Sequence, residues 1–348
     1  MKFIVVAFFI LFGTSLFSQL EHSTELKNYF SKLPDKVQLA IAVIEDGVPT
    51  YYGFIKEGDQ IRVSENKDAL FEIGSITKVF TSTLLANLIV NGKIKPQATA
   101  NQYFKFKFKE KESIKLIELS NHTSGLPRLP SNFVTSGFIP DNPYKNYTVT
   151  DFQEYLKDGL KLNAKPGMTY DYSNTGAGLL GTIIGVSQKT TYRELIQQLI
   201  FDPYEMTATY TSATSIENRM IKGMQEDGNE VANWDWDAFA GTGCIISSVV
   251  DLSTFALAQF NPENKELALT HVPTFTINDR MKIGMGWHIV SSSKTGAEYL
   301  WHNGGTGGYS SSMALDVLQK NGIILLSNIA PGDGEIDALC FGLLEQLK

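Results

Sequence analysis

Apolar residues along the chain fall into patterns typical of strands near both ends and of helices between them. Residues 37–56 contain two β-rich runs joined by Glu45-Asp46-Gly47, which predicts a hairpin. From residue 284 the pattern again predicts strands, in runs over residues 284–293, 298–303, 309–317 and 322–330. Residues 334–347 follow as a predicted helix.

The middle of the chain has the spacing of helices. A largely apolar helix is expected over residues 75–91, with Gly92 as its C-terminal stop. Pro, Asn and Gly cluster between the helices, most of all over residues 124–147, where we expect loops that line a ligand site. Further helices are predicted over residues 113–121, 149–158, 174–188, 192–201 and 249–260.

These patterns predict an α/β fold in which both ends of the chain build one layer that carries a helical insertion. We expect an α/β sheet domain from residues 19–80 and 280–348, and a mainly helical domain from residues 81–279. A ligand site is expected between the two domains.

The first 18 residues have the pattern of a secretory signal. Lys2 precedes an apolar run from Phe3 to Phe12, and small polar residues follow. A bilayer span needs roughly 20 apolar residues, so an uncleaved membrane anchor is the less favoured interpretation. We expect cleavage near Ser18, a secreted or periplasmic product, and no membrane span after processing.

Composition excludes several classes of protein. The 348 residues are 43% hydrophobic and 19% charged, too apolar for a disordered chain. The formal net charge of -7 leaves no basic excess to hold a nucleic-acid backbone. Two cysteines, Cys244 and Cys340, are too few for a disulfide scaffold, and buried thiols are favoured over a disulfide. None of the five histidines has metal-ligand spacing.

The candidate chemistry depends on a serine. The pattern Ser-x-x-Lys occurs three times, at residues 64–67, 75–78 and 291–294, so context must decide among them. The G-x-S-x-G elbow of α/β-hydrolases is absent from the sequence. A G-x-G-x-x-G at residues 176–181 lies inside a predicted helix with no strand before it, which indicates helix packing.

Ser75 has the most favourable context of the three. It follows Gly74 at the start of the predicted helix 75–91, where Lys78 lies on the same face and can reach its hydroxyl. In the first turn of a helix the Ser75 N–H is free to bind an oxyanion. On an apolar helix Lys78 is desolvated and can accept a proton. From position alone, a plain helix cap with a snorkelling Lys78 is an equally good interpretation.

Tyr172 and Asn174 favour the catalytic interpretation. They lie two apart in a turn-rich, extended segment, so they point to the same side. A phenol there can exchange protons with the serine, while an amide holds a substrate carbonyl. The alternative is an aromatic side chain packed at a helix entry. Tyr144 and Asn146 have the same spacing but lie in a Pro-rich loop with no following helix.

Residues 301–309 supply a third candidate segment, with four glycines in five positions after His302-Asn303. Such a segment lets a ligand or another backbone approach closely. It can pair with a peptide-like substrate and offer a second N–H to an oxyanion. The alternative is a glycine-rich turn with His302 on the surface.

Three motifs in this order resemble those of the penicillin-recognising serine enzymes: Ser75-Ile-Thr-Lys78, Tyr172-Ser-Asn174 and His302-Asn-Gly304. The likeness is closest to class C β-lactamases and their DD-peptidase and esterase relatives, and covers roughly residues 36–330. The resemblance implies the β-lactamase/transpeptidase-like fold, an antiparallel sheet flanked by terminal helices with a largely helical insertion. Further stretches that look like the family are residues 119–127, 166–167 and 201–206.

The resemblance also implies roles for single residues. Ser75 would be the acylated nucleophile, and Lys78 and Tyr172 its proton-transfer partners, either of which can be the base. The N–H groups of Ser75 and Gly305 would form the oxyanion hole. No metal or cofactor is implied. The substrate-binding residues would be Asn174, which binds the amide carbonyl, and His302, Asn303, Gly304 and Gly305.

The third motif departs from the family pattern, which usually has Lys-Thr-Gly there. A literal Lys294-Thr295-Gly296 occurs, but in a predicted turn, whereas His302 leads directly into the next strand as the pattern requires. A histidine supplies less positive charge than a lysine at neutral pH. Capture of a substrate carboxylate, and with it the efficiency on β-lactams, is therefore expected to be lower.

We expect an exported, monomeric serine hydrolase. Its predicted substrates are β-lactams first and D-Ala-D-Ala peptides second, with a carboxylesterase as a further alternative. Nucleic acid is not an expected partner. The competing class is a catalytically silent peptidoglycan-binding module on the same fold, and intact Ser75, Lys78 and Tyr172 argue against it.

Overall fold

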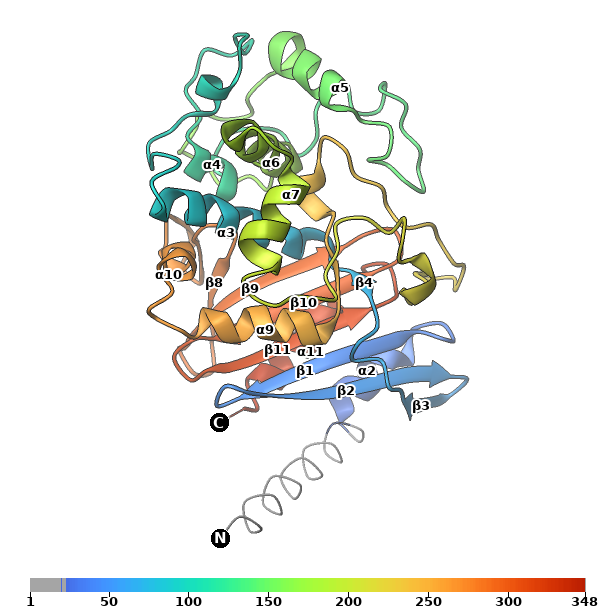
Figure 1. Ribbon diagram of the computed structural model, residues 1–348. Helices are drawn as coiled ribbons and strands as arrows, with labels where there is room; N and C mark the ends of the chain where they lie inside the picture. Colours follow the sequence, from blue (N-terminus) through green and yellow to red (C-terminus); the bar gives the residue numbers. More distant parts are fainter. Residues whose placement is uncertain (1–19, 21–22, 348) are drawn as a thin grey trace.

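The computed structural model describes residue 20 and residues 23–347, so the predicted signal segment lies outside the described residues. Its main sheet has nine strands in the order β3-β2-β1-β11-β10-β9-β8-β7-β6, and every neighbouring pair is antiparallel (Figure 1). The strands are β1 (Gln38–Glu45), β2 (Val48–Glu57), β3 (Gln60–Val63), β6 (Phe275–Asn278), β7 (Met281–Ile283), β8 (His288–Ser291), β9 (Glu298–Gly305), β10 (Ser310–Asp316) and β11 (Asn321–Ser327).

Strands from the two ends of the chain meet inside this sheet. β1 pairs with β11, and Ile41 lies opposite Leu325. The single layer predicted from both ends is therefore confirmed. The predicted hairpin is confirmed as β1 and β2, which turn at Asp46 and Gly47 with φ values of 51° and 78°. Positive φ at both positions is the conformation of a tight two-residue hairpin turn.

Helices cover both faces of the sheet, which explains its nearly continuous apolar strands. On one face lie α2 (Thr24–Ser31) and α11 (Glu335–Leu344), and on the other lies α9 (Val249–Gln259) (Figure 1). The side chains of β1 alternate between these faces. Leu39 and Ile41 belong to the cluster that contains α2 and α11, whereas Ala40 and Ala42 belong to the cluster that contains α9.

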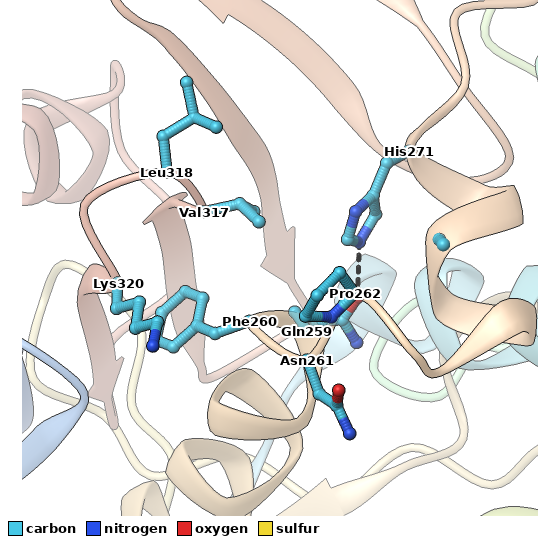
Figure 2. A pocket seen from close by; sticks show the side chains of 9 residues that line it. Gln259, Phe260, Asn261, Pro262, His271, Val317, Leu318 and Lys320 are labelled. Carbon is cyan, nitrogen blue, oxygen red and sulfur yellow. Dashed lines mark hydrogen bonds between the residues drawn. The ribbon is translucent and has the colours of Figure 1, made fainter.

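A cavity of about 410 Å³ lies where the chain leaves α9, beside α10 (Lys265–His271) and the turn between β10 and β11 (Figure 2). In its wall His271 Nε2 lies 2.8 Å from Gln259 Oε1, and the exposed side chain of Leu318 also lines it. None of the residues predicted for the active site lines this cavity.

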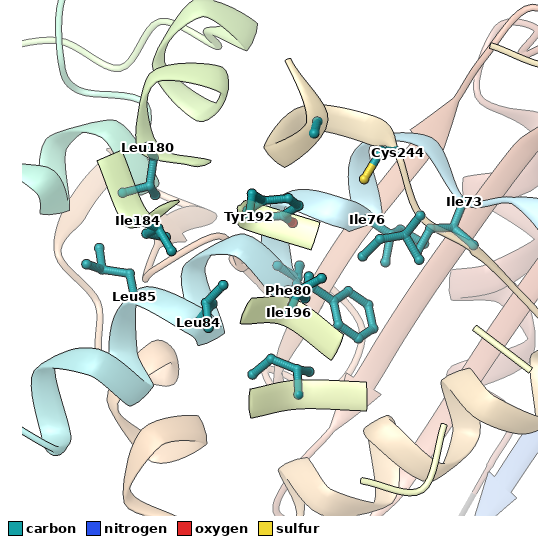
Figure 3. Close-up of a cluster of buried hydrophobic side chains, with 14 of the residues drawn as sticks. Ile73, Ile76, Phe80, Leu84, Leu85, Leu180, Ile184, Tyr192, Ile196 and Cys244 are labelled. Atoms are coloured by element: carbon teal, nitrogen blue, oxygen red, sulfur yellow. The ribbon is translucent and has the colours of Figure 1, made fainter. Parts of the chain in front are cut away.

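Helix α3 (Thr77–Val90) forms the centre of the helical part. Residues 77–86 are all buried, and Lys78 is the one charged side chain among them. Phe80 stacks on Phe255 of α9 with 4.1 Å between ring centroids, so α3 joins the helical part to the sheet layer. Figure 3 shows Phe80 and Leu84 in the apolar cluster that α3 shares with its neighbours.

The remaining described elements are shorter helices, a small sheet and several turns. The helices are α4 (Leu116–Ser120), α5 (Val149–Glu154), α6 (Asn174–Gln188), α7 (Tyr192–Ile196) and α8 (Ala240–Gly243). The strands β4 (Phe71–Glu72) and β5 (Ile246–Ser247) form the small sheet, and the turns are the π-turns Tyr155–Gly159 and Gln197–Phe201 and the 3-10 turns Gly74–Ile76, Ala100–Tyr103 and Glu217–Arg219.

Several predicted elements coincide with the structure, and others differ for local reasons. The helix predicted over residues 174–188 is α6. Its glycines pack closely, because a Cβ on Gly181 would lie 3.0 Å from the Cα of Gly241, which confirms the packing interpretation. The helix predicted from residue 75 instead begins with the 3-10 turn Gly74–Ile76, in which Gly74 has a φ of 49°. The strand predicted over 284–293 is shorter, because residues 284–287 form a turn in which Gly284 N–H donates to the Trp287 carbonyl.

Three predictions concern the chain as a whole. Both cysteines are buried and free, and burial raises the pKa of Cys244 to about 11 and that of Cys340 to about 12. Within the described residues, no helix is both long and apolar enough to cross a membrane. The domain boundaries near residues 80 and 280 stay predictions, and one apolar cluster extends across them.

Candidate active site

Ser75 and Lys78 form the centre of the candidate site. Ser75 is half-buried in the 3-10 turn Gly74–Ile76, directly before α3. Lys78 Nζ donates to Ser75 Oγ at 2.8 Å and to the Thr242 carbonyl at 3.0 Å. Burial of Lys78, whose exposure is 2%, and the nearby charge of Arg128 hold its pKa well below the ordinary value. A lysine with so low a pKa can take a proton from the serine hydroxyl.

Tyr172 lies beside this pair, in the extended segment before α6. Lys78 Nζ is 5.0 Å from the centroid of its ring, and the guanidinium carbon of Arg128 is 5.3 Å from it. Burial raises the pKa of Tyr172, and a hydrogen bond with Ser75 opposes that rise. The phenol therefore keeps its proton at neutral pH and can donate it, while Lys78 accepts one.

His302 faces Tyr172 from β9. Its ring centroid lies 6.3 Å from that of Tyr172, and the side chain is 1% exposed, so the alternative of a surface histidine is wrong. His302 Nδ1 lies 2.6 Å from the Asn303 carbonyl, which can only accept, so the proton is on Nδ1. Burial, with the charges of His288 and Lys78, lowers the pKa of His302 well below its ordinary value. The third motif therefore presents a neutral imidazole.

The strand alternation of β9 separates the other residues of the third motif. The Asn303 side chain points to the opposite face, where Nδ2 donates to Asp337 of α11 at 2.7 Å, so this side chain does not reach Tyr172. Gly304 lies against the turn of Ser75, because a Cβ there would be 2.0 Å from the Ile73 carbonyl oxygen and 2.8 Å from the Ser75 nitrogen. Gly305 lies beside Gly74, because a Cβ added to Gly74 would be 2.5 Å from the Gly305 nitrogen.

Asn174 is the first residue of α6, which Ser173 caps by accepting the Gly176 N–H at 2.9 Å. Asn174 Nδ2 donates to Tyr144 Oη at 2.9 Å, and the buried Oδ1 has no hydrogen-bond partner within the described part of the chain. That oxygen and the second amide hydrogen can bind a substrate amide. Tyr144 in turn stacks on Trp236 with 4.2 Å between ring centroids, so Trp236 packs against the tyrosine that holds Asn174.

Sequence reasoning assigned no role to His122, which the structure places against Tyr172. The two ring centroids are 4.3 Å apart, and His122 Nδ1 accepts the N–H of Ser173 at 3.2 Å. Burial lowers the pKa of His122, so a neutral ring supports the phenol. Tyr170 and His288 continue the cluster through a 2.8 Å hydrogen bond. The available signal was the run 119–127, which contributed to the family resemblance only.

The two rejected Ser-x-x-Lys patterns lie in other surroundings. Ser64 follows β3 and donates its backbone N–H to Gly53, and Ser291 is the last residue of β8. Lys294 belongs to the turn between β8 and β9, is exposed, and pairs with Glu345 at 2.6 Å. Among the described residues, no cluster of three or more His, Cys, Asp or Glu side chains could hold a metal ion.

Comparisons with known proteins bear on the family and the fold of the chain. The family model described as Beta-lactamase matches residues 26–339. A beta-lactamase of Pseudomonas fluorescens is 27% identical over 73% of this chain and 70% of its own length. Protein flp of Staphylococcus aureus is 24% identical over 80% of this chain, which spans 56% of that longer protein.

Solved structures show the same fold at lower identity. The D-alanine carboxypeptidase AmpC of Burkholderia cenocepacia matches 93% of this chain and 97% of its own, with a TM-score of 0.75 and 19% identity. A beta-lactamase/D-alanine carboxypeptidase of Pseudomonas syringae matches 93% of this chain and 98% of its own, with a TM-score of 0.77 and 21% identity. The β-lactamase/transpeptidase-like fold expected from the sequence is confirmed.

Proposed function

This chain belongs to the beta-lactamase family of serine hydrolases, and from that membership we propose that it forms an acyl-enzyme on Ser75. The observation that supports this proposal most strongly is the 2.8 Å contact between Lys78 Nζ and Ser75 Oγ. It occurs where burial holds the pKa of the amine well below its ordinary value. A serine beside a neutral amine is an activated nucleophile.

The proposed acylation uses the opposite pKa shifts of Lys78 and Tyr172. Lys78 takes the proton of Ser75 Oγ as this oxygen attacks the carbonyl carbon of the substrate amide. The N–H groups of Ser75 and Gly305 bind the oxyanion. Tyr172 then protonates the leaving nitrogen and recovers a proton from Lys78, as the C–N bond breaks. Water hydrolyses the resulting ester, with Lys78 again as the base.

β-Lactams are the first proposed substrate class, because the name beta-lactamase recurs among the relatives. D-Ala-D-Ala peptides and carboxylic esters form the second class. The buried, neutral His302 favours the esters within this second class, since it supplies no cation for the free carboxylate that β-lactams and D-Ala-D-Ala peptides both carry. Asn174 would hold the acyl-side amide carbonyl of a β-lactam or a peptide.

The test combines a chromogenic cephalosporin with a fluorescent penicillin, for the wild type and for Ser75→Ala. Turnover supports a β-lactamase, and stable labelling supports a penicillin-binding peptidase. Ser75→Ala should abolish both, whereas the matched control Ser64→Ala, from a rejected Ser-x-x-Lys pattern, should leave both unchanged. Equal activity of Ser75→Ala and the wild type would show that the mechanism is wrong.

A silent peptidoglycan-binding module would bind cell-wall fragments without turnover or labelling of any kind.

We also propose export of a monomeric protein, on the basis of the N-terminal pattern. Mass spectrometry of the periplasmic or secreted protein should find a chain that begins near Gln19. A chain that retains residues 1–18 would contradict this part of the proposal.

A further inference from the structure

Two cations contact the ring of Tyr172 among the residues that the structure describes, and they differ in exposure. Lys78 is buried and is held toward its neutral form. The side chain of Arg128 is exposed, and its guanidinium carbon lies 5.3 Å from the ring centroid of Tyr172. A guanidinium stays charged at every physiological pH. Arg128 is therefore the lasting positive charge beside the proposed catalytic phenol.

The charge of Arg128 has no carboxylate counter-ion among the residues that the structure describes. In the described part of the chain no carboxylate lies within 4.0 Å of its guanidinium, whereas Arg62 pairs with Glu57, and Lys145 with Asp235. The main chain of Arg128 is fixed, because its carbonyl accepts the N–H of Thr175 at 3.1 Å. An anchored residue thus presents a free guanidinium, a fork of donors suited to a carboxylate.

The other candidate cations near the site, His302 and Lys294, are not available to bind a substrate anion. His302 is buried and neutral at the position where the family usually has a lysine. Lys294 is exposed and paired with Glu345. A substrate anion that entered this site would therefore find its lasting cation at Arg128 rather than on β9.

Backbone contacts show which part of a substrate would meet Arg128. The segment of Pro127 and Arg128 runs along Ser173 and Thr175, since Ser173 Oγ donates to the Pro127 carbonyl at 2.8 Å and Thr175 N–H donates to the Arg128 carbonyl. Asn174 lies between these two anchor points. In the proposed function Asn174 holds the amide carbonyl of the acyl part.

We propose that Arg128 is a specificity-determining residue that binds a carboxylate on the acyl part of the substrate. The inference rests on the proposed acyl-enzyme function and names its preferred substrate class, acyl donors with an anionic side chain. The bond-making steps at Ser75 are unchanged. Arg128 contributes to binding, so its loss should appear in KM more than in kcat.

The test uses three cephalosporins with the same chromogenic leaving side. One carries a glutaryl acyl group that ends in a carboxylate, the second carries the matching carboxamide, and the third is the carboxamide with its ring carboxylate methylated. Arg128→Gln should lower kcat/KM for the first compound by about tenfold and change the second and third less than about twofold. Arg128→Lys should recover part of the loss.

Arg219→Gln is the matched control, because Arg219 is exposed and lies 5.5 Å from the ring centroid of Tyr210 in a similar geometry. It should behave as the wild type, and thermal unfolding should show that all variants are folded. Equal loss on all compounds, or a loss that follows the ring carboxylate, would overturn the inference. If the acyl-enzyme is stable, the rate of Ser75 acylation by intact mass replaces turnover. Absence of both turnover and acylation in the wild type would instead refute the proposed function.

Discussion

The close approach of β9 to the turn that carries Ser75 makes Gly304→Ala a sharp test of the site. A Cβ at residue 304 would lie 2.0 Å from the carbonyl oxygen of Ile73 and 2.8 Å from the nitrogen of Ser75. Both are backbone atoms, which no side-chain rotation can move aside. Separating the Cβ from the carbonyl oxygen by even 3.0 Å requires the strand and the turn to move apart by about 1 Å, the difference between 3.0 and 2.0 Å.

We expect this displacement to reduce catalysis far more than stability. A shift of this size, or the loss of one oxyanion donor, costs about a hundredfold or more in rate. Overpacking costs about 1–3 kcal/mol in the free energy of unfolding, less than the roughly 5–15 kcal/mol typical of native proteins. Gly304→Ala should therefore stay folded, with kcat/KM lowered at least about a hundredfold.

The assay is hydrolysis of the chromogenic cephalosporin, or the acylation rate of Ser75 if turnover is slow, beside thermal unfolding. Gly342→Ala is the control, since a Cβ there would meet Glu25 Cγ at 3.8 Å, an ordinary contact. It should leave activity unchanged. A folded Gly304→Ala protein with activity within about threefold of the wild type would refute the assignment of β9 to the oxyanion site.

Three further predictions follow from the same geometry. Lys78→Met places an apolar side chain at a buried position and should lower the rate of Ser75 acylation by about 10²–10⁴-fold, measured by burst kinetics. A burst in this variant as fast as in the wild type would exclude Lys78 as the base. Burial lowers the pKa of His288 to about 4, so the unfolded chain binds a proton between pH 6.5 and 4 that the folded protein does not. The free energy of unfolding should therefore fall as the pH drops through this window. His288→Phe should reduce this dependence on pH, measured by denaturant titrations at several pH values. A variant whose free energy of unfolding falls as steeply as that of the wild type would contradict the prediction. His302→Ala should lower kcat/KM clearly while Lys294→Ala, which removes an exposed ion pair, should not; the reverse order would move the third motif to Lys294.

Local signals explain why some of the fold could be predicted from sequence. The hairpin at Asp46-Gly47 and the helix 174–188 carry their turn and cap residues within the segment itself. The sequence patterns did not predict α2, α10, β3, β6 and β7, although Ser23 caps α2 and Asn264 caps α10. β6 has only four residues, which alternate between half-buried and exposed positions, so its apolar pattern is too short to separate from a loop.

The contacts of the candidate site also divide into those that sequence spacing predicts and those that depend on how distant segments pack. The contact of Lys78 with Ser75 follows from their spacing of three residues, and sequence reasoning anticipated it. The hydrogen bond of Asn174 with Tyr144 joins two segments 30 positions apart, and no periodicity in the chain encodes it. The stacking of His122 on Tyr172 likewise depends on how two loops pack. The charge at Arg128 needed the structure to show both its neighbour and its lack of a counter-ion.

The pairing of β1 with β11 also bears on the order of folding. Gln38 donates its N–H to the side chain of Asn328, 290 positions later, beside this pair of strands. Closing so long a loop is slow, and β1 has no partner on that edge until almost the whole chain has been synthesised. A ribosome-bound fragment that stops before β11 should therefore remain open and sensitive to protease. The two ends of the chain would then join in one sheet only in the last step of folding.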